Sequence, residues 1–331
     1  MLKLRKKIIS LALIGMLSTS CANKDNKDVY VPVDSIDGNL FINEEEISYN
    51  GSTEYIEEEK EYEVKRVHYA RLINDTNVFD EESNIIGTAA YNTKYEIVSS
   101  DEDYYKVKYY NKVGYISKTD ATMYIQKEVN NDIIEHVYNT DSITINIPSD
   151  LSPSNKEMKV SIEPNSLIDV YIDKDDELFV SVNGFTGYIN KDNLSDLSDD
   201  FVSVDISEQK LTFYVDNQVD LIAPVVTGGK GHETPIGVFN IYEQTKNRYL
   251  VGPTWRSYVN YMSKFYDGCG LHDAEKITDK YGKYHGWRDK EEFGGYTYLK
   301  NGSHGCVNML NSDAEYVCER INSDTNVIVK K

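Results

Sequence analysis

The chain has 331 residues, of which 40% are hydrophobic, and a formal net charge of -20 at pH 7. Single hydrophobic cores usually stop growing before this length, so two or three domains are expected. The 27 tyrosines and only 7 prolines favour β-rich modules, because aromatic side chains suit a pleated, half-buried surface. The acidic charge argues against nucleic acid or an anionic bilayer surface as a direct partner, since both repel it.

The first twenty residues have the pattern of a secretory signal peptide. A basic start that includes Arg5 precedes an apolar run at 8–17 and small residues at 18–20, and this run is too short to span a bilayer. The stretch ending in Cys21 resembles a bacterial lipobox, although Ser18 replaces the usual leucine. The resemblance implies a lipidated Cys21 and a membrane anchor. The alternative is a plainly secreted or uncleaved chain, and in each case the protein is expected outside the cytoplasm.

The remaining sequence divides into a tether and three β-rich units. Residues 21–62 are polar and acidic, which predicts an extended tether. Residues 63–125 and 131–195 each contain alternating runs that end in Gly-Tyr-Ile, predicting two small β-barrels of about five strands. The Gly-Tyr-Ile ending resembles bacterial SH3 modules. Residues 200–331 change to a β meander, with alternating or apolar runs at 201–206, 210–215, 219–227 and 238–242. The predicted fold class is therefore mainly β.

Three cysteines remain when Cys21 is set apart, and an odd number in an exported chain favours a free thiol with a function or an intermolecular bridge. Cys318 lies among apolar residues at helical spacing in 313–321, with residues 311–313 as possible caps, which predicts a small core residue. Cys269 is compatible with a place near a site or in the core, and the core is favoured.

The most informative motif is Ser303-His304-Gly305-Cys306-Val307-Asn308. A cysteine on a glycine-containing loop just before a capped helix is expected to favour the thiolate form. A nucleophilic cysteine also needs a base within hydrogen-bonding distance. Of the six histidines, His68 and His136 lie in the repeat region and His232 lies among polar residues, predicting a solvated position. His272 and His285 remain as candidate bases.

Residues 200–331 resemble the catalytic domain of L,D-transpeptidases, the YkuD family. The motif 303–308 matches the family ending at every position, and Thr-Pro-Ile-Gly at 234–237 and His-Asp-Ala at 272–274 match two upstream features. The spacer between His272 and Ser303 is longer than usual, and the usual length would reach only to His285. However, the residues at 287–288 and 293–295 resemble those that normally come after the family histidine. This suggests an insertion at about 275–286 and favours His272.

The resemblance implies a mechanism and its residues. Cys306 would attack the third residue of a donor tetrapeptide stem of peptidoglycan and release D-alanine, with His272 as the base. An acceptor amine from a neighbouring stem would then complete a 3-3 cross-link. Backbone N–H groups of Gly305 and Cys306, aided by His304, would stabilise the oxyanion, with Ser303 and Asn308 in supporting roles. Asp273 would either orient His272 or face solvent. No cofactor or metal is implied, and carbapenems are expected to acylate Cys306.

Several alternatives stay open. Within the same family, water as acceptor would give an L,D-carboxypeptidase, and an inactive last domain would leave a wall-binding SH3 protein. An NlpC/P60 peptidase would need the cysteine before the histidine, and a sortase would need an arginine soon after Cys306, where the first is Arg320. A zinc peptidase using His272, His304 and Cys306 lacks His-Glu-x-x-His spacing.

Overall fold

A computed structural model describes residues 31–32, 61–252, 256–278, 282 and 284–331. Strands dominate it. After the short strand β1 (Val31–Pro32), three large sheets succeed one another along the chain, and a separate two-stranded sheet lies within the last unit. The predicted signal peptide, Cys21 and nearly all of the predicted tether lie outside the described residues. The mainly β fold class is confirmed.

The first sheet is formed by residues 64–129 in the order β4-β3-β7-β6-β5-β2-β8. Its strands are β2 (Val64–Leu72), β3 (Thr76–Phe79), β4 (Ile85–Ala89), β5 (Lys94–Ser100), β6 (Tyr104–Tyr109), β7 (Lys112–Ser117) and β8 (Ala121–Val129). It has seven strands where about five were expected, and the boundary drawn at 125 falls inside β8. The unit extends past residue 125 because β8 pairs with β2 along its whole length. The sequence of β8 did not show this, because polar and charged residues mask its alternation.

The second sheet has the order β1-β11-β10-β14-β13-β12-β9-β15. Its further strands are β9 (Glu135–Asn139), β10 (Ile143–Ile147), β11 (Met158–Ile162), β12 (Leu167–Asp173), β13 (Glu177–Val182), β14 (Phe185–Asn190) and β15 (Leu194–Asp196). Here too the number of strands exceeds the prediction. Val31–Pro32, placed in the tether by the sequence, pairs in parallel with β11. The SH3-like character of these two sheets stays a prediction.

The third sheet has nine strands in the order β19-β26-β16-β17-β18-β25-β22-β21-β20. They are β16 (Phe201–Asp205), β17 (Lys210–Val215), β18 (Gln218–Val226), β19 (Gly237–Asn240), β20 (Glu243–Val251), β21 (Arg256–Tyr266), β22 (Cys269–Asp273), β25 (Val307–Met309) and β26 (Asn326–Lys330). Four of them correspond to the runs predicted from 201 to 242. One face of the sheet packs against helix α2 (Asn311–Cys318) in a core that includes Leu271, Val307, Val317 and Cys318.

Helix α2 begins differently from the prediction. Its N-cap residue is Leu310, without a side-chain capping hydrogen bond, so the predicted caps at 311–313 are wrong. The carboxylate of Glu275 instead accepts a hydrogen bond from the Asn311 backbone N–H, at 3.0 Å. A distant acidic residue thus satisfies a free N–H at the positive end of the helix. Among the described residues the α-helices are α1 (Thr297–Asn301) and α2, and neither is long enough to cross a bilayer.

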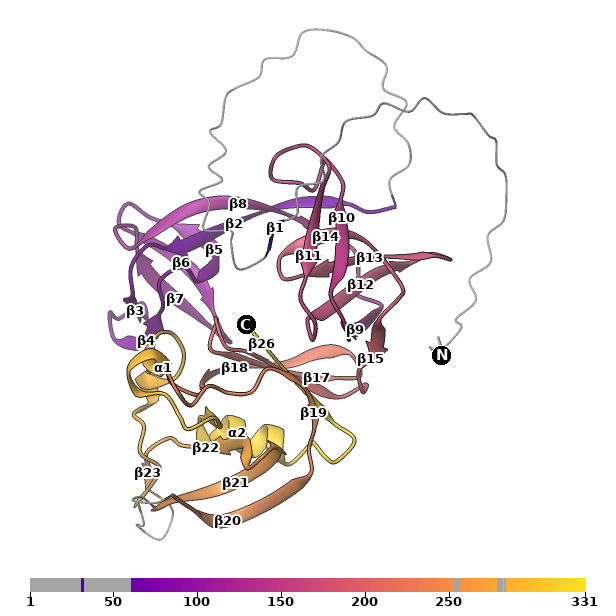
Figure 1. The fold of residues 1–331 in the computed structure, drawn as a ribbon. Helices are drawn as coiled ribbons and strands as arrows, with labels where there is room; N and C mark the ends of the chain where they lie inside the picture. The colour runs from indigo at the N-terminus through magenta and orange to yellow at the C-terminus, as the bar shows by residue number, and fades with distance from the viewer. Residues whose placement is uncertain (1–30, 33–60, 253–255, 279–281, 283) are drawn as a thin grey trace, which may run out of the picture.

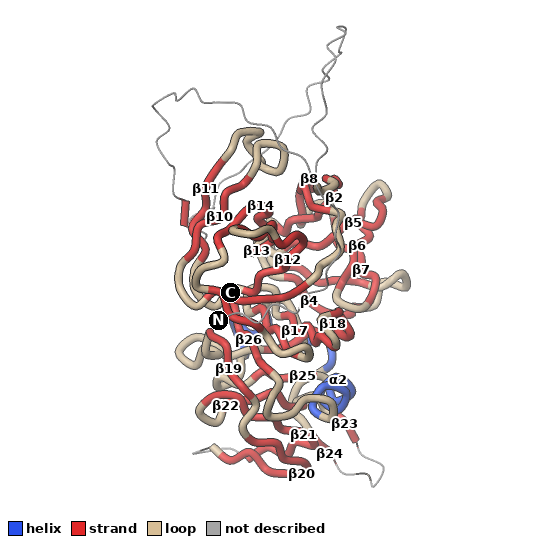
Figure 2. Tube along the Cα trace, turned by 90° about the vertical axis from the view of Figure 1, so that its right-hand side faces the viewer, coloured by secondary structure: helices blue, strands red, loops and turns tan. Residues whose placement is uncertain are grey.

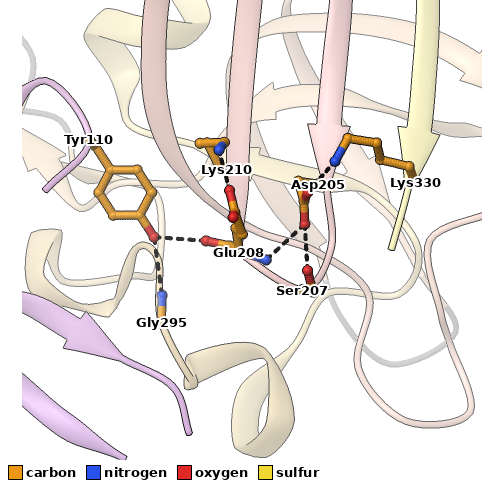
Figure 3. A network of polar contacts seen from close by, with 7 residues as sticks. All are labelled: Tyr110, Asp205, Ser207, Glu208, Lys210, Gly295 and Lys330. Carbon is orange, nitrogen blue, oxygen red and sulfur yellow. Dashed lines mark hydrogen bonds and ion pairs between the residues drawn. The ribbon is translucent and has the colours of Figure 1, made fainter. Parts of the chain in front are cut away.

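Both N-terminal sheets lie at the same end of the third sheet, as Figures 1 and 2 show from two directions. The second sheet contacts β16 and β17 through the His136 ring, whose centroid lies 5.3 Å from that of Phe201 and 4.8 Å from that of Tyr214. The first sheet contacts the β16–β17 turn and Gly295 through Tyr110, which Figure 3 shows from close by.

A buried ion pair joins the two ends of the third unit. Asp205, only 6% exposed, pairs with Lys330 and also accepts hydrogen bonds from the Ser207 hydroxyl and the Glu208 backbone N–H (Figure 3). Burial by itself raises the pKa of Asp205, but the charges of Lys330 and Lys210 outweigh it and lower this pKa to about 2. The carboxylate therefore stabilises the fold wherever it is ionised.

We predict that Asp205→Asn lowers the free energy of unfolding by about 2 kcal/mol at pH 7. The folded pKa lies below the ordinary value of 3.8. The contribution of the ionised Asp205 carboxylate to the free energy of unfolding is therefore complete above about pH 4 and is lost as the pH falls toward 2. Urea denaturation at pH 7, 4 and 3 should show the gap between wild type and variant closing only in the acid range.

The matched control is Glu319→Gln, which breaks the exposed Lys246–Glu319 pair. It should change the free energy of unfolding by less than about 1 kcal/mol at every pH. A gap for Asp205→Asn that stayed constant from pH 7 to 3, or that equalled the control, would contradict the assignment of this stability to the ionised carboxylate.

Candidate active site

The candidate site is built on the parallel pairing of β22 with β25. In this register Leu271 lies opposite Val307, and His272 lies opposite Asn308. Leu271 and Val307 belong to the hydrophobic core, and successive residues of a strand point to opposite faces. His272 and Asn308 therefore share the other face, and Cys306, two residues before Asn308, is expected on that face as well.

A hydrogen-bond network fixes the protonation pattern of the His272 ring. The Nε of buried Arg288 donates to Asn308 Oδ1 at 2.8 Å, so the Asn308 Nδ2 group faces His272 Nε2, at 3.1 Å. Because Nδ2 can only donate, Nε2 is the unprotonated acceptor. The other ring nitrogen, Nδ1, then carries the proton and donates to the Asp273 backbone oxygen at 2.9 Å. This tautomer has its basic nitrogen on the Asn308 side.

Burial lowers the pKa of His272, and the charge of Arg288 lowers it further, against the hydrogen bond to the Asp273 backbone. The imidazole is therefore neutral at pH 7. Asp273 is buried rather than facing solvent, and its carboxylate accepts hydrogen bonds from the backbone N–H groups of Asn260 and Tyr261, each at 2.8 Å. The orientation of His272 comes from the backbone of Asp273, while the carboxylate supplies negative charge nearby.

His285 occupies a different element. It lies on β24 (Tyr284–His285), which pairs with β23 (Ile277–Thr278) outside the nine-stranded sheet, and its ring lies 4.6 Å from that of Tyr258. The two ends of the segment that carries His285 lie next to each other, because Ala274 O accepts hydrogen bonds from the backbone N–H groups of both Trp287 and Arg288. The segment between them thus starts and ends at the same place, as expected of an insertion after the family histidine.

Cys306 has its sulfur between two backbone groups of the adjoining strand. The thiol lies 4.0 Å from Gly268 O, and the Gly270 N–H is directed toward the sulfur. Although the residue is partly exposed, its sulfur is crowded, and this burial raises the pKa of the Cys306 thiol to about 11. The expectation that the surroundings favour thiolate is wrong, because strand β25 separates the cysteine from helix α2 and the helix gives it no positive end.

No hydrogen bond joins the Cys306 thiol to the His272 ring among the described residues. The two groups are both neutral, and Cys306 comes two residues before Asn308, which the register pairs with His272. His272 Nε2 already accepts from Asn308 Nδ2, so this hydrogen bond has to open before the ring can take a proton from the thiol. This arrangement suits general-base catalysis, in which the proton moves as the sulfur attacks, more than a permanent thiolate–imidazolium pair.

The loop before Cys306 is closed by Ser303. The Ser303 hydroxyl donates to Cys306 O and accepts from the Gly305 N–H at 3.1 Å. The Gly305 N–H is therefore occupied within the loop, which contradicts its predicted role toward an oxyanion. Gly305 has another function: its φ is +104°, and a Cβ there would lie 2.8 Å from Cys269 Sγ. Only glycine fits both constraints.

The glycine-rich segment before β19 packs on this loop. Gly228 bridges to Ser303, and the Gly229 N–H donates to Ser303 O at 3.1 Å. The two segments bring two exposed imidazoles together, since the ring of His304 lies 4.6 Å from that of His232. His232 is therefore solvated, as predicted, but it also adjoins the cysteine loop, which its polar neighbours in the sequence did not indicate.

The other two described cysteines belong to the core side. Cys318 is buried in the core on α2, and Cys269 packs partly buried against the same cluster. Residues 269 and 271 point to one face of β22, opposite to the face that carries His272. Among the described residues, no group of three or more His, Cys, Asp or Glu side chains is placed to hold a metal ion.

Sequence reasoning missed Arg288 as a site residue. It is 1% exposed, and besides Asn308 its guanidinium contacts Asn301 O at 2.7 Å. A lone arginine beside Trp287 gave no signal by spacing. A buried arginine is rare unless its charge has a specific partner. The only indication was the resemblance of residues 287–288 to the segment that comes after the histidine in the family.

Comparison with known proteins places the likeness in this last unit. Residues 199–329 match the sequence profile of the YkuD family, described as the L,D-transpeptidase catalytic domain. The match confirms the resemblance predicted for residues 200–331. No curated protein matches the chain.

Solved structures of L,D-transpeptidases are also similar. A mutant of the Enterococcus faecium enzyme is 28% identical, with 40% of this chain and 50% of that chain covered and a TM-score of 0.35. The catalytic domain of the E. faecium enzyme acylated by ertapenem is 27% identical, with 41% of this chain and 100% of that chain covered and a TM-score of 0.35. An L,D-transpeptidase from Mycobacterium tuberculosis is 18% identical, with 54% of this chain and 73% of that chain covered and a TM-score of 0.33. The chain thus spans half the length of the first of these.

We predict that alkylation of Cys306 by iodoacetamide rises with pH to a midpoint near 11. Only the thiolate reacts, and burial raises the pKa of this thiol to about 11. At pH 7 the rate should be well below that of an ordinary free cysteine. Peptide mapping by mass spectrometry after timed alkylation separates Cys306 from Cys269 and Cys318. A rate already at its plateau by pH 8 would show a preformed thiolate and contradict the neutral pair.

Gly305→Ala is expected to destabilise the fold by about 1–3 kcal/mol, because alanine disfavours the left-handed backbone that the loop requires. Part of the loss comes from the contact with Cys269 Sγ. The double variant with Cys269→Ala should therefore recover some stability but not all of it, as measured by urea denaturation. A full recovery would show that the backbone angle is unimportant, and no effect of Gly305→Ala at all would refute both reasons.

Proposed function

We propose that the protein is a cysteine L,D-transpeptidase of peptidoglycan, since its residues 199–329 match the catalytic domain of that family. The observation that supports the proposal is the pairing of His272 with Asn308, two residues after Cys306, on adjacent strands, with the basic nitrogen of His272 hydrogen-bonded to Asn308. The substrate is the tetrapeptide stem of a donor strand, and the products are a 3-3 cross-link and free D-alanine.

The first half-reaction is acyl transfer to sulfur. Cys306 Sγ attacks the carbonyl carbon of the third stem residue, and its proton passes to His272 Nε2 as the hydrogen bond from Asn308 Nδ2 to that nitrogen opens. The imidazolium that forms keeps its Nδ1–H on the Asp273 backbone oxygen, and the buried Asp273 carboxylate stabilises the new positive charge. The tetrahedral intermediate then breaks its C–N bond, His272 returns the proton to the leaving amine, and D-alanine departs.

The second half-reaction releases the enzyme. The amine of an acceptor stem attacks the thioester, gives its proton to His272, and forms the amide bond as the C–S bond breaks and the thiol is restored. Of the backbone donors first assigned to the oxyanion, the Cys306 N–H remains, because the Gly305 N–H is bound by Ser303. The Gly270 N–H, directed toward the sulfur, is a second donor at the site. His304 is exposed beside them.

The proposal includes the place of action. A leader with a basic start and an apolar run, followed by Cys21, supports export and lipid attachment, with the membrane anchor at the N-terminus. Polymerised peptidoglycan lies outside the cytoplasm, so the location expected from the leader agrees with the proposed substrate. The two N-terminal sheets then stand between the anchor and the catalytic unit.

The test is intact mass spectrometry of residues 22–331 with a disaccharide-tetrapeptide, and separately with a carbapenem. Wild type should form a thioester adduct, release D-alanine and be acylated by the carbapenem. Cys306→Ala should abolish all three, because it removes the nucleophile. His272→Ala should lower D-alanine release by about 10²-fold or more, which is typical for loss of a general base.

His285→Ala is the matched control, because it removes a buried histidine of the same domain that lies outside the nine-stranded sheet. It should leave the adduct and D-alanine release intact. Loss in His285→Ala alone would mean that His272 is the wrong base. Hydrolysis without transfer, when an acceptor amine is supplied, would replace the transpeptidase with a carboxypeptidase, and no adduct in wild type would remove the proposal.

A further inference from the structure

Tyr110 occupies an unusual position at the tip of the β6–β7 hairpin. Its φ is +51°, in the left-handed region that costs a bulky aromatic residue about 1–2 kcal/mol. Asparagine or glycine would be the ordinary choice for such a turn. The residue is nevertheless a tyrosine, and burial raises its pKa well above the ordinary value. The energetic cost of this backbone is offset by the contacts of the side chain.

Those contacts belong to the catalytic unit. The Tyr110 hydroxyl donates to Glu208 O at 3.1 Å and accepts from the Gly295 N–H at 3.4 Å (Figure 3). The fit is close, because a Cβ on Gly294 would lie 2.5 Å from the Tyr110 hydroxyl oxygen and a Cβ on Gly295 would meet the backbone of Thr88. Two consecutive glycines with positive φ thus accept the first sheet at this point, where no larger residue fits.

From Glu208 a continuous series of hydrogen bonds leads to the cysteine loop. The next residue, Gln209, is fully buried, and its side chain accepts from the Thr227 N–H at 2.9 Å and donates to the Thr227 hydroxyl at 2.7 Å. Thr227 O accepts from the Ser303 N–H at 2.9 Å, and the Ser303 hydroxyl donates to Cys306 O. Gln209, Thr227 and Ser303 are all buried, so water competes little for these bonds.

We propose that Tyr110 is a positioning residue for Cys306, acting through Glu208, Gln209, Thr227 and Ser303, so that the first β-sheet unit is part of the catalytic apparatus rather than a spacer. The inference rests on the proposed function only for its effect on turnover. The hydroxyl fixes the turn that carries Gln209, Gln209 fixes Thr227, and Thr227 fixes the loop in which the thiol is buried.

The test compares Tyr110→Phe with Tyr69→Phe in the full chain. Both variants lose one hydroxyl in the first sheet, but the Tyr69 hydroxyl donates to Glu128 within that sheet. Tyr110→Phe should lower kcat for D-alanine release about three- to tenfold with KM unchanged, the size expected of coupling through a packed network. Tyr69→Phe should keep the wild-type kcat. Thermal unfolding of each variant checks that both are folded at the assay temperature.

Alkylation of Cys306 by iodoacetamide gives a readout that does not need transpeptidase activity. Because burial is what raises the pKa of this thiol, a loosened loop exposes the sulfur and speeds alkylation at pH 8, while turnover slows. Tyr110→Phe should therefore alkylate at least about twofold faster than wild type, and Tyr69→Phe at the wild-type rate. If wild type released no D-alanine, the proposed function would fail while this comparison still decided the role of Tyr110.

A double-mutant cycle with Gln209→Asn tests the route. Asparagine tolerates the positive φ of this position but its shorter side chain loses Thr227. If Tyr110 acts through Gln209, the double variant should lose less in kcat than the product of the two single losses. Independent losses would overturn the route. Equal kcat and equal alkylation rates in Tyr110→Phe and Tyr69→Phe would overturn the proposal as a whole.

Discussion

The register between β22 and β25 is the constraint on which the rest of the site depends. It is set by hydrophobic burial, because Leu271, Val307 and Met309 face the core on alternate positions. A slip of one residue would turn these side chains to the other face and place the polar side chains of His272 and Asn308 in the hydrophobic core. Hydrophobic packing therefore sets the relative position of the two strands. The hydrogen bonds among Arg288, Asn308 and His272 then fix the orientation of these side chains.

Electrostatics in this site favour two neutral partners. Burial raises the pKa of Cys306 and lowers that of His272, so the same physical effect removes charge from both. Arg288 adds a nearby positive charge that opposes an imidazolium, and the Asp273 carboxylate opposes Arg288. The structure thus keeps the proton on the Cys306 sulfur and leaves the His272 imidazole neutral.

The sequence allowed prediction of whatever depended on local pattern or on a contiguous motif. Alternation located the strands at 201–205 and 210–215, and the six residues around Cys306 indicated the family. Contacts between distant segments were not predictable, because spacing along the chain carries no trace of them. Glu275 at the start of α2, Arg288 on Asn308 and Tyr110 on Gly295 are examples. The thiolate expectation failed for the same reason, since burial of the sulfur depends on the whole loop.

The crowded sulfur of Cys306 has a consequence for chemical durability. Peroxides and disulfides react with thiolate, and oxidation to sulfinic or sulfonic acid is not reversed by simple thiols. A thiol with a pKa of about 11 presents almost none of that reactive form near neutral pH. The burial that crowds the sulfur therefore also protects this thiol from oxidation.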